Sequence, residues 1–188
     1  MKPATALAAG LLAAACLPAA AVPLLQGTTV TGTVSGASSV LLGIADGYAE
    51  LVGPVSAPVS GVLGDIEFLT GDYALGIDFD EHGLVSVIDN SGGALLAGTY
   101  AFSFSFAGLA DDIGRFTLGD LSALAGGSVQ LSVWDGQTVT LTLTDLQFAQ
   151  PYAAITAQLA VPEPGSALLA FAGLAMLGTL RRAARPGR

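Results

Sequence analysis

Strict alternation of two residue types is the feature that most constrains how this 188-residue chain folds. In residues 100–106 every second residue is aromatic, and alanine or serine stands between. In residues 138–144 threonine alternates with valine or leucine. Successive side chains of a strand point to opposite faces, so a period of two predicts strands with one buried face. We expect the aromatic and aliphatic positions to face a core and the threonines to face water.

Strand patterns cover most of the region between the two chain ends. Strands are predicted for residues 28–35, 73–79, 84–88, 100–106, 128–134 and 138–148. Asp135 and Gly136 predict a tight hairpin turn, because both residue types tolerate the positive φ of primed turns. A short helix is expected at residues 121–125. Together the patterns predict an all-β fold, with a single antiparallel β-sandwich or jelly-roll-like domain over residues 22–160.

The N-terminus has the three parts of a secretory signal peptide. Lys2 supplies positive charge, residues 4–16 are apolar, and small residues precede a predicted cleavage after Ala21. Residues 1–21 are therefore expected to direct export. Cys16 leaves a lipoprotein signal open, although the nearest leucine stands four places before it instead of the usual three. Since Cys16 is the only cysteine, the processed chain is expected to contain no disulfide.

The C-terminus carries a second short signal. Residues 161–164 read Val-Pro-Glu-Pro, residues 165–180 are an apolar run, and residues 181–188 are basic. The two prolines favour an extended backbone in the first part. As a helix the 16-residue run spans about 24 Å, against a hydrocarbon core of roughly 30 Å. We predict a transmembrane helix there, with Arg181, Arg182 and Arg185 as the basic stop that keeps the C-terminus cytoplasmic.

The order of these parts resembles the sorting signal of the PEP-CTERM family of exported bacterial proteins. The resemblance is confined to residues 161–188. It implies that an exosortase, a membrane-embedded processing enzyme, recognises Pro162, Glu163 and Pro164 while the helix holds the chain in the inner membrane. It also implies delivery to the cell surface or to an extracellular matrix that contains exopolysaccharide. It implies nothing about what residues 22–160 do.

Negative charge dominates the predicted domain. Residues 22–160 contain fourteen acidic residues and one basic residue, Arg115, which gives a formal balance of −13. Such a surface repels the phosphate backbone, so nucleic acid is excluded as a partner. The simplest role for the charge is solubility, and screening by cations is an alternative.

A possible metal site lies in the second half of the strand-rich region. Asp78, Asp80 and Asp89 occupy the first, third and twelfth positions of a segment that imitates a calcium-binding loop. His82 stands at the fifth position, where that loop needs an oxygen ligand, and strands flank the segment instead of helices. Calcium is therefore the one cofactor candidate, and the main expectation is that no cofactor binds.

The competing interpretation of this segment is a β-hairpin. A turn at residues 81–83 pairs Phe79 with Val85 and Ile77 with Val87, and the glycine at residue 83 supplies the positive φ. We prefer the hairpin.

Catalysis is not expected. The chain has one histidine, no G-x-S-x-G motif and no cysteine after signal removal, which argues against nucleophilic and zinc-dependent hydrolysis. A pair of carboxylates suffices for a glycoside hydrolase, so that enzyme class remains a distant alternative.

Two ladders of side chains are candidate binding surfaces. The first ladder is aromatic and consists of Tyr100, Phe102, Phe104 and Phe106. These side chains would bind sugar rings if they are exposed and would form core if they are buried. The second ladder consists of the threonines of two predicted strands, Thr29, Thr31, Thr33, Thr138, Thr140, Thr142 and Thr144. Such ladders resemble those of ice-binding proteins, although exposed threonine is common in strands. The sequence thus predicts an exported, non-enzymatic β-protein, with a calcium-, glycan- or ice-binding module as the alternative.

Overall fold

Eleven β-strands and one 3₁₀ helix form the part of the chain that the computed structural model describes, residues 23–62 and 65–161. The strands are β1 (Thr29–Gly36), β2 (Leu41–Gly43), β3 (Val55–Pro58), β4 (Phe68–Thr70), β5 (Leu75–Phe79), β6 (Leu84–Asp89), β7 (Leu96–Ala107), β8 (Arg115–Leu118), β9 (Leu124–Asp135), β10 (Thr138–Phe148) and β11 (Ala154–Ala160). The 3₁₀ helix η1 covers Ile44–Asp46. Within these residues no helix has the length and apolar character needed to cross a membrane.

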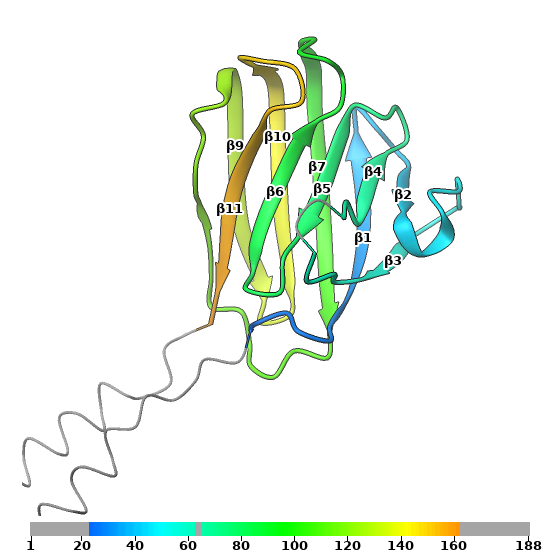
Figure 1. Ribbon diagram of the computed structural model, residues 1–188, viewed down its shortest axis with the longest axis vertical. Coiled ribbons are helices and arrows are strands. Elements are labelled where there is room, and N and C mark those ends of the chain that lie inside the picture. Colours follow the sequence, from blue (N-terminus) through cyan, green and yellow to red (C-terminus); the bar gives the residue numbers. More distant parts are fainter. Residues whose placement is uncertain (1–22, 63–64, 162–188) are drawn as a thin grey trace, which may run out of the picture.

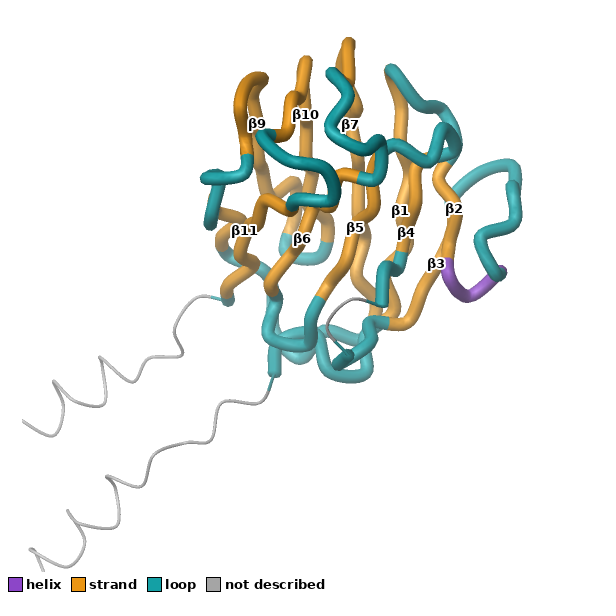
Figure 2. Tube along the Cα trace, turned by 45° about the horizontal axis from the view of Figure 1, so that its top comes forward, coloured by secondary structure: helices purple, strands orange, loops and turns teal. Residues whose placement is uncertain are grey.

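The strands form two antiparallel sheets that lie face to face (Figure 1). Sheet A has five strands in the order β3-β1-β7-β10-β9, and sheet B has six in the order β2-β4-β5-β6-β11-β8. Figure 2 shows the same two layers from a tilted view, with loops gathered at the two ends of the strands. The predicted all-β, antiparallel, sandwich-like fold is confirmed.

The period-two patterns hold where the strands are long. In β7 the residues at 100, 102, 104 and 106 are buried, and in β10 those at 139, 141 and 143 are buried. The intervening serines and threonines remain half-buried or exposed. Each strand therefore has one face in the core and one toward solvent, as the alternation predicts.

The core lies between the sheets and is rich in phenylalanine. Phe104 of sheet A packs against Phe79 and Phe68 of sheet B, with ring centroids 5.0 and 5.6 Å apart. Phe102 stacks beside Phe104 at 5.8 Å. Since Phe104 is fully buried, the aromatic ladder is a core face, and its alternative role as an exposed sugar-binding surface is ruled out.

The predicted helix at residues 121–125 is wrong. The chain makes a turn there, closed by the Leu124 N–H donating to the Leu121 carbonyl at 3.0 Å, and β9 begins at Leu124. Leucine and alanine favour helices locally, but five residues are too few to form a stable helix without tertiary support. Five further strands, β2, β3, β4, β8 and β11, were not predicted.

The β9–β10 hairpin is present, but its turn differs from the prediction. Asp135 pairs with Thr138, so the turn residues are Gly136 and Gln137, and neither Asp135 nor Gly136 has a positive φ. The Asp135 carboxylate instead accepts the Gln137 N–H at 2.9 Å and closes the turn. A Cβ at Gly136 would lie 2.3 Å from the Cγ of Asp112, so a larger residue there would require the exposed Asp112 side chain to move.

The β5–β6 hairpin follows the predicted register. Ile77 pairs with Val87 and Phe79 with Val85, and Gly83 has a φ of +87°. The Asp80 carboxylate accepts the N–H groups of His82 and Leu84 at 2.8 and 2.7 Å. The turn therefore satisfies its own backbone donors with an aspartate.

Two predicted segments lie outside the described residues. They are the signal peptide at residues 1–21, with its cleavage at Ala21, and the sorting signal beyond Val161 with its predicted transmembrane helix and basic end. Both stay predictions.

Candidate functional site

The three predicted calcium ligands do not converge. The pairs Leu75–Asp89 and Asp78–Ser86 stand three ladder positions apart in the same hairpin. Because successive positions alternate between faces, Asp78 and Asp89 point to opposite sides of sheet B. Among the described residues no group of three or more potential metal ligands was found.

Asp89 has a structural task of its own. Its side chain is fully buried and accepts hydrogen bonds from the Ser91 hydroxyl at 2.5 Å and the Gly93 N–H at 2.7 Å. The Tyr152 N–H donates to the same carboxylate at 3.3 Å. Asp89 thus ties the loop after β6 to the loop before β11, and its lone pairs are occupied by the protein.

Glu67 is a buried acid that sequence patterns did not single out. Phe68 pairs with Ile77 in the β4–β5 ladder, so the neighbouring positions, Glu67 and Asp78, also lie opposite each other. Burial raises the pKa of Glu67 to about 7, and the nearby negative charge of Asp78 adds to this, against the lowering effect of backbone hydrogen bonds. A raised carboxyl pKa is one mark of a catalytic acid.

The surroundings of Glu67 are nevertheless those of a structural group. Its two oxygens accept the N–H groups of Ser60 and Phe79 at 3.0 and 2.8 Å, and its side chain has no exposed surface. The Tyr48 hydroxyl donates to the Ile66 carbonyl and holds the adjoining loop in place. Glu67 joins this loop to β5 and does not meet solvent in this conformation.

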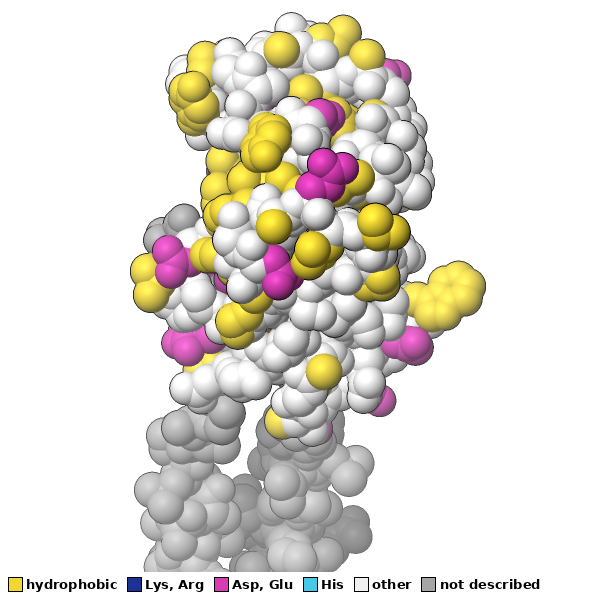
Figure 3. Space-filling model, turned by 90° about the vertical axis from the view of Figure 1, so that its right-hand side faces the viewer, with side chains coloured by type: hydrophobic (Ala, Val, Ile, Leu, Met, Phe, Trp, Pro, Cys, Tyr) yellow, Lys and Arg dark blue, Asp and Glu magenta, His cyan; other side chains and the backbone are white. Residues whose placement is uncertain are grey.

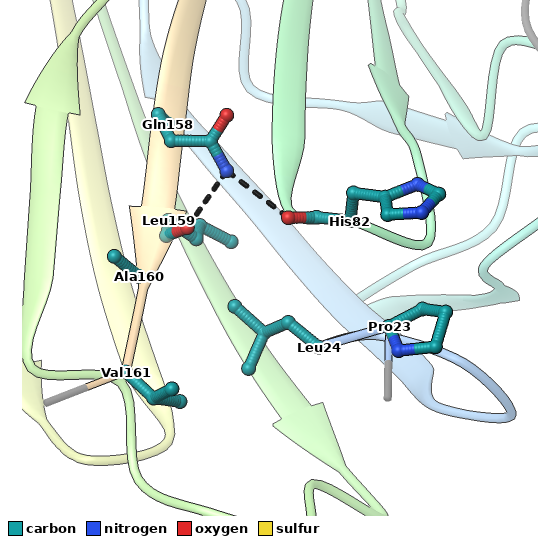
Figure 4. Close-up of a pocket in the computed structure, with 7 residues that line it drawn as sticks. All are labelled: Pro23, Leu24, His82, Gln158, Leu159, Ala160 and Val161. Atoms are coloured by element: carbon teal, nitrogen blue, oxygen red, sulfur yellow. Dashed lines mark hydrogen bonds between the residues drawn. The ribbon is translucent and has the colours of Figure 1, made fainter. Parts of the chain in front are cut away.

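One open pocket lies where the described chain begins and ends (Figure 4). It has a volume of about 310 Å³ and is lined mainly by apolar side chains. Pro23 and Val161 are both in its wall, beside the tip of the β5–β6 hairpin. The Gln158 amide donates to the carbonyls of His82 and Leu159 at 3.0 and 2.8 Å, which fixes β11 to that hairpin. The pocket offers no pair of acidic groups for catalysis.

The outer side of sheet A is a broad surface of small hydroxyl groups. The predicted threonine ladders belong to β1 and β10, and the topology places β7 between them. The three strands present threonine and serine in register, and β3 and β9 extend the surface on either side. We call this surface the hydroxyl face, and it consists of Thr29, Thr31, Thr33, Ser35, Ser56, Thr99, Ser103, Ser105, Ser128, Ser132, Thr138, Thr140, Thr142 and Thr144.

Hydrogen bonds between strands order several of these hydroxyl groups. Ser132 and Thr140 are joined at 2.7 Å, and a second such bond links Thr31 to Ser56 at 2.8 Å. A longer bond of 3.1 Å links Thr99 and Thr144 near the far end. A hydroxyl group both donates and accepts, so each pair still has hydrogen-bonding capacity toward solvent or a ligand.

A solvent-exposed tryptophan stands at the edge of the hydroxyl face. Val133 pairs with Val139 and Asp135 with Thr138, which leaves Trp134 as the extra residue of a bulge in the edge strand β9. Val133 packs against the core, whereas Trp134 lies beside Asp135, which pairs with Thr138 on the outer side of the sheet. The Trp134 side chain is 80% exposed.

Charge is distributed unevenly around the sandwich. Of the fourteen acidic residues between 22 and 160, the strands of sheet A contain two, Asp135 and Asp145, each at a bulge in the β9–β10 pair. Figure 3, viewed from the side of β2 and β3, shows acidic side chains and no basic ones on that surface. The centre of the hydroxyl face, between these two bulges, therefore carries no charged side chain, although the domain is acidic.

Comparisons with protein-family models, with curated proteins and with solved structures found no match.

Proposed function

We propose that this chain is an exported, non-enzymatic protein of the bacterial cell surface or extracellular matrix. In this proposal residues 1–21 direct export, and an exosortase sorts and processes the chain through Pro162, Glu163 and Pro164. The membrane contact is made by the helix predicted at residues 165–180, with the C-terminus cytoplasmic until processing.

One geometric observation supports this proposal beyond the sequence signals. Pro23 and Val161, at the two ends of the described domain, line the same pocket (Figure 4). A domain that presents both chain ends at one place accepts processing at either end without the opening of a sheet.

The last strand also ends before the proposed processing signal. β11 stops at Ala160, whose carbonyl accepts the Gly114 N–H at 2.9 Å, and the Pro-Glu-Pro element follows one residue later. Removal of everything after Val161 would leave all eleven strands intact.

Substitution of Glu163 in the bacterium that makes the protein tests the proposal. We expect Glu163→Ala to raise the molecular weight of the accumulated protein and to keep it in the membrane fraction. Glu50→Ala, at an exposed acid of the domain, is the matched control and should be processed normally. If Glu163→Ala leaves both molecular weight and surface delivery unchanged, the sorting proposal is wrong.

A second candidate, glycan binding, is favoured by the hydroxyl face together with Trp134. This candidate concerns what the domain does after delivery.

A further inference from the structure

We propose that the hydroxyl face and Trp134 form a binding surface for a neutral polysaccharide. The hexose chain lies across the strands of sheet A, and one sugar ring stacks on the Trp134 indole. This goes beyond the proposed export and sorting, and it holds or fails independently of them.

The centre of the hydroxyl face carries no charged side chain. Exposed threonine is common in strands, so the threonines alone identify no ligand. In a domain with a formal charge of −13, however, sheet A bears acidic residues at two bulges only, and none between them. A uronic-acid polymer would be repelled by the domain, whereas a neutral polymer is not. A basic protein would bind more favourably to the acidic parts of the domain outside sheet A than to this face.

The side chains of the hydroxyl face have the same hydrogen-bonding groups as a sugar. Sugar hydroxyls donate and accept hydrogen bonds, and serine and threonine hydroxyls do the same. Threonine is restricted at χ1, and the Ser132–Thr140 and Thr31–Ser56 bonds restrict the hydroxyl positions further. A surface that is already ordered loses little conformational entropy when a ligand binds.

Trp134 adds an exposed aromatic side chain to the edge of the hydroxyl face. An exposed indole combines a large apolar surface with one N–H donor, which is why tryptophan is enriched at binding sites. Its neighbours on the same face are Ser132, two residues earlier, and Thr138, opposite the bulge. A sugar ring stacked on the indole therefore has hydroxyl partners within its reach.

The hydroxyl groups form rows that run across the strands, and we expect the bound polysaccharide to follow such a row. Ser132, Thr140, Ser103 and Thr33 form one row across four adjacent strands. With strands about 4.8 Å apart, the row extends about 14 Å from the strand that carries Trp134. The face is therefore long enough for a segment of several sugars.

The single tryptophan makes the test specific, because tryptophan fluorescence, excited selectively over that of tyrosine, reports Trp134 alone. The purified full chain, in a detergent without a sugar headgroup, is titrated with hydroxyethyl cellulose and with galactomannan, and with alginate as the acidic polymer. We expect a blue shift and protection from acrylamide quenching with at least one neutral polymer and no change with alginate. Affinity electrophoresis in gels that contain the same polymers measures binding without the fluorophore.

Two variants and one control complete the experiment. Trp134→Ala is expected to weaken binding about tenfold or more, a loss of ~1.4 kcal/mol or more. Ser132→Ala with Thr140→Val keeps the indole but removes a hydroxyl pair, and should weaken binding several-fold. Tyr152→Asn removes an aromatic side chain that is 70% exposed in the β10–β11 loop and should bind like the wild type.

Several results would overturn the proposal. In affinity electrophoresis, these results are the absence of retardation by either neutral polymer and equal retardation of wild type and Trp134→Ala. Tighter binding to alginate than to the neutral polymers would also overturn it. A Trp134 blue shift with phosphatidylcholine vesicles but with no polymer would assign the residue to a membrane surface instead. A shift that depends on protein concentration alone would assign it to contact between two copies.

Discussion

Replacement of Glu67 by glutamine should remove most of the pH dependence of folding stability between pH 5 and pH 8. Glu67 is fully buried and accepts hydrogen bonds from two backbone N–H groups, with Asp78 beside it. Burial is the main cause that raises its pKa to about 7 from an ordinary value of 4.5. The folded protein therefore binds this proton more tightly than the unfolded chain does.

The sign and size of the effect follow from that difference. A raised carboxyl pKa means that Glu67 favours the folded state most at low pH, where it is protonated in the fold. The contribution decreases as the pH rises from 4.5 to about 7 and is absent above that range. Between pH 5 and pH 8 the two pKa values give a loss of about 2–3 kcal/mol in the free energy of unfolding.

Glutamine cannot reproduce both hydrogen bonds. Its side chain has one oxygen for the two N–H donors, so Glu67→Gln is about 1–3 kcal/mol less stable than wild type at pH 5. The stability of the variant does not change through residue 67 as the pH rises, whereas that of wild type falls. We expect the variant to be less stable than wild type at pH 5 and close to wild type at pH 8.

Urea denaturation followed by far-ultraviolet circular dichroism at both pH values measures these free energies. The measurement is made in a His82→Gln background, which removes the single histidine, exposed at the hairpin tip. Glu50→Gln, at an exposed acid, should retain the wild-type pH dependence. A wild-type protein more stable at pH 8 than at pH 5, or a Glu67→Gln variant with an unchanged slope, would refute the reasoning.

Three further predictions concern the packing of the sandwich. Phe104→Ala should lower the free energy of unfolding by about 3–5 kcal/mol in urea titrations, since the ring is fully buried between the sheets. Gly83→Ala should cost more than Gly47→Ala in the same assay: both glycines have positive φ, but a Cβ at Gly83 would lie 2.9 Å from the Leu159 carbonyl oxygen and one at Gly47 would meet nothing within 4 Å. Tyr100→Phe removes the hydroxyl that donates to Asp72 at 2.7 Å, and carboxyl NMR titration should show the pKa of Asp72, now below its ordinary value despite desolvation, move upward.

The long strands could be predicted because their alternation is strict. β7 and β10 have aromatic or aliphatic side chains at every second position, and the sandwich buries those side chains. The sequence pattern did not single out Trp134, whose place in a bulge of β9 depends on the pairing with β10. What the pattern did not give was the arrangement of β1, β7 and β10 side by side, which comes from pairing between distant segments.

Other features depend on tertiary contacts that a sequence pattern does not contain. β4 has three residues, too few for any period to be detected, and β11 alternates through alanines, which are weak strand formers. Glu67 lies next to a short strand, and its buried carboxylate is held by hydrogen bonds from Ser60 and Phe79, which are distant in the sequence. Asp78 and Asp89 fit the spacing of a calcium loop, yet the hairpin register sends them to opposite faces.

The mass of the mature protein, isolated from the surface fraction of the bacterium that makes it, tests the central claim most directly. The unprocessed chain of 188 residues has a mass of 18.7 kDa. The account predicts a lighter protein whose first residue is Val22 and whose C-terminal apolar run and arginines have been removed. An intact chain that ends at Arg188 would contradict it.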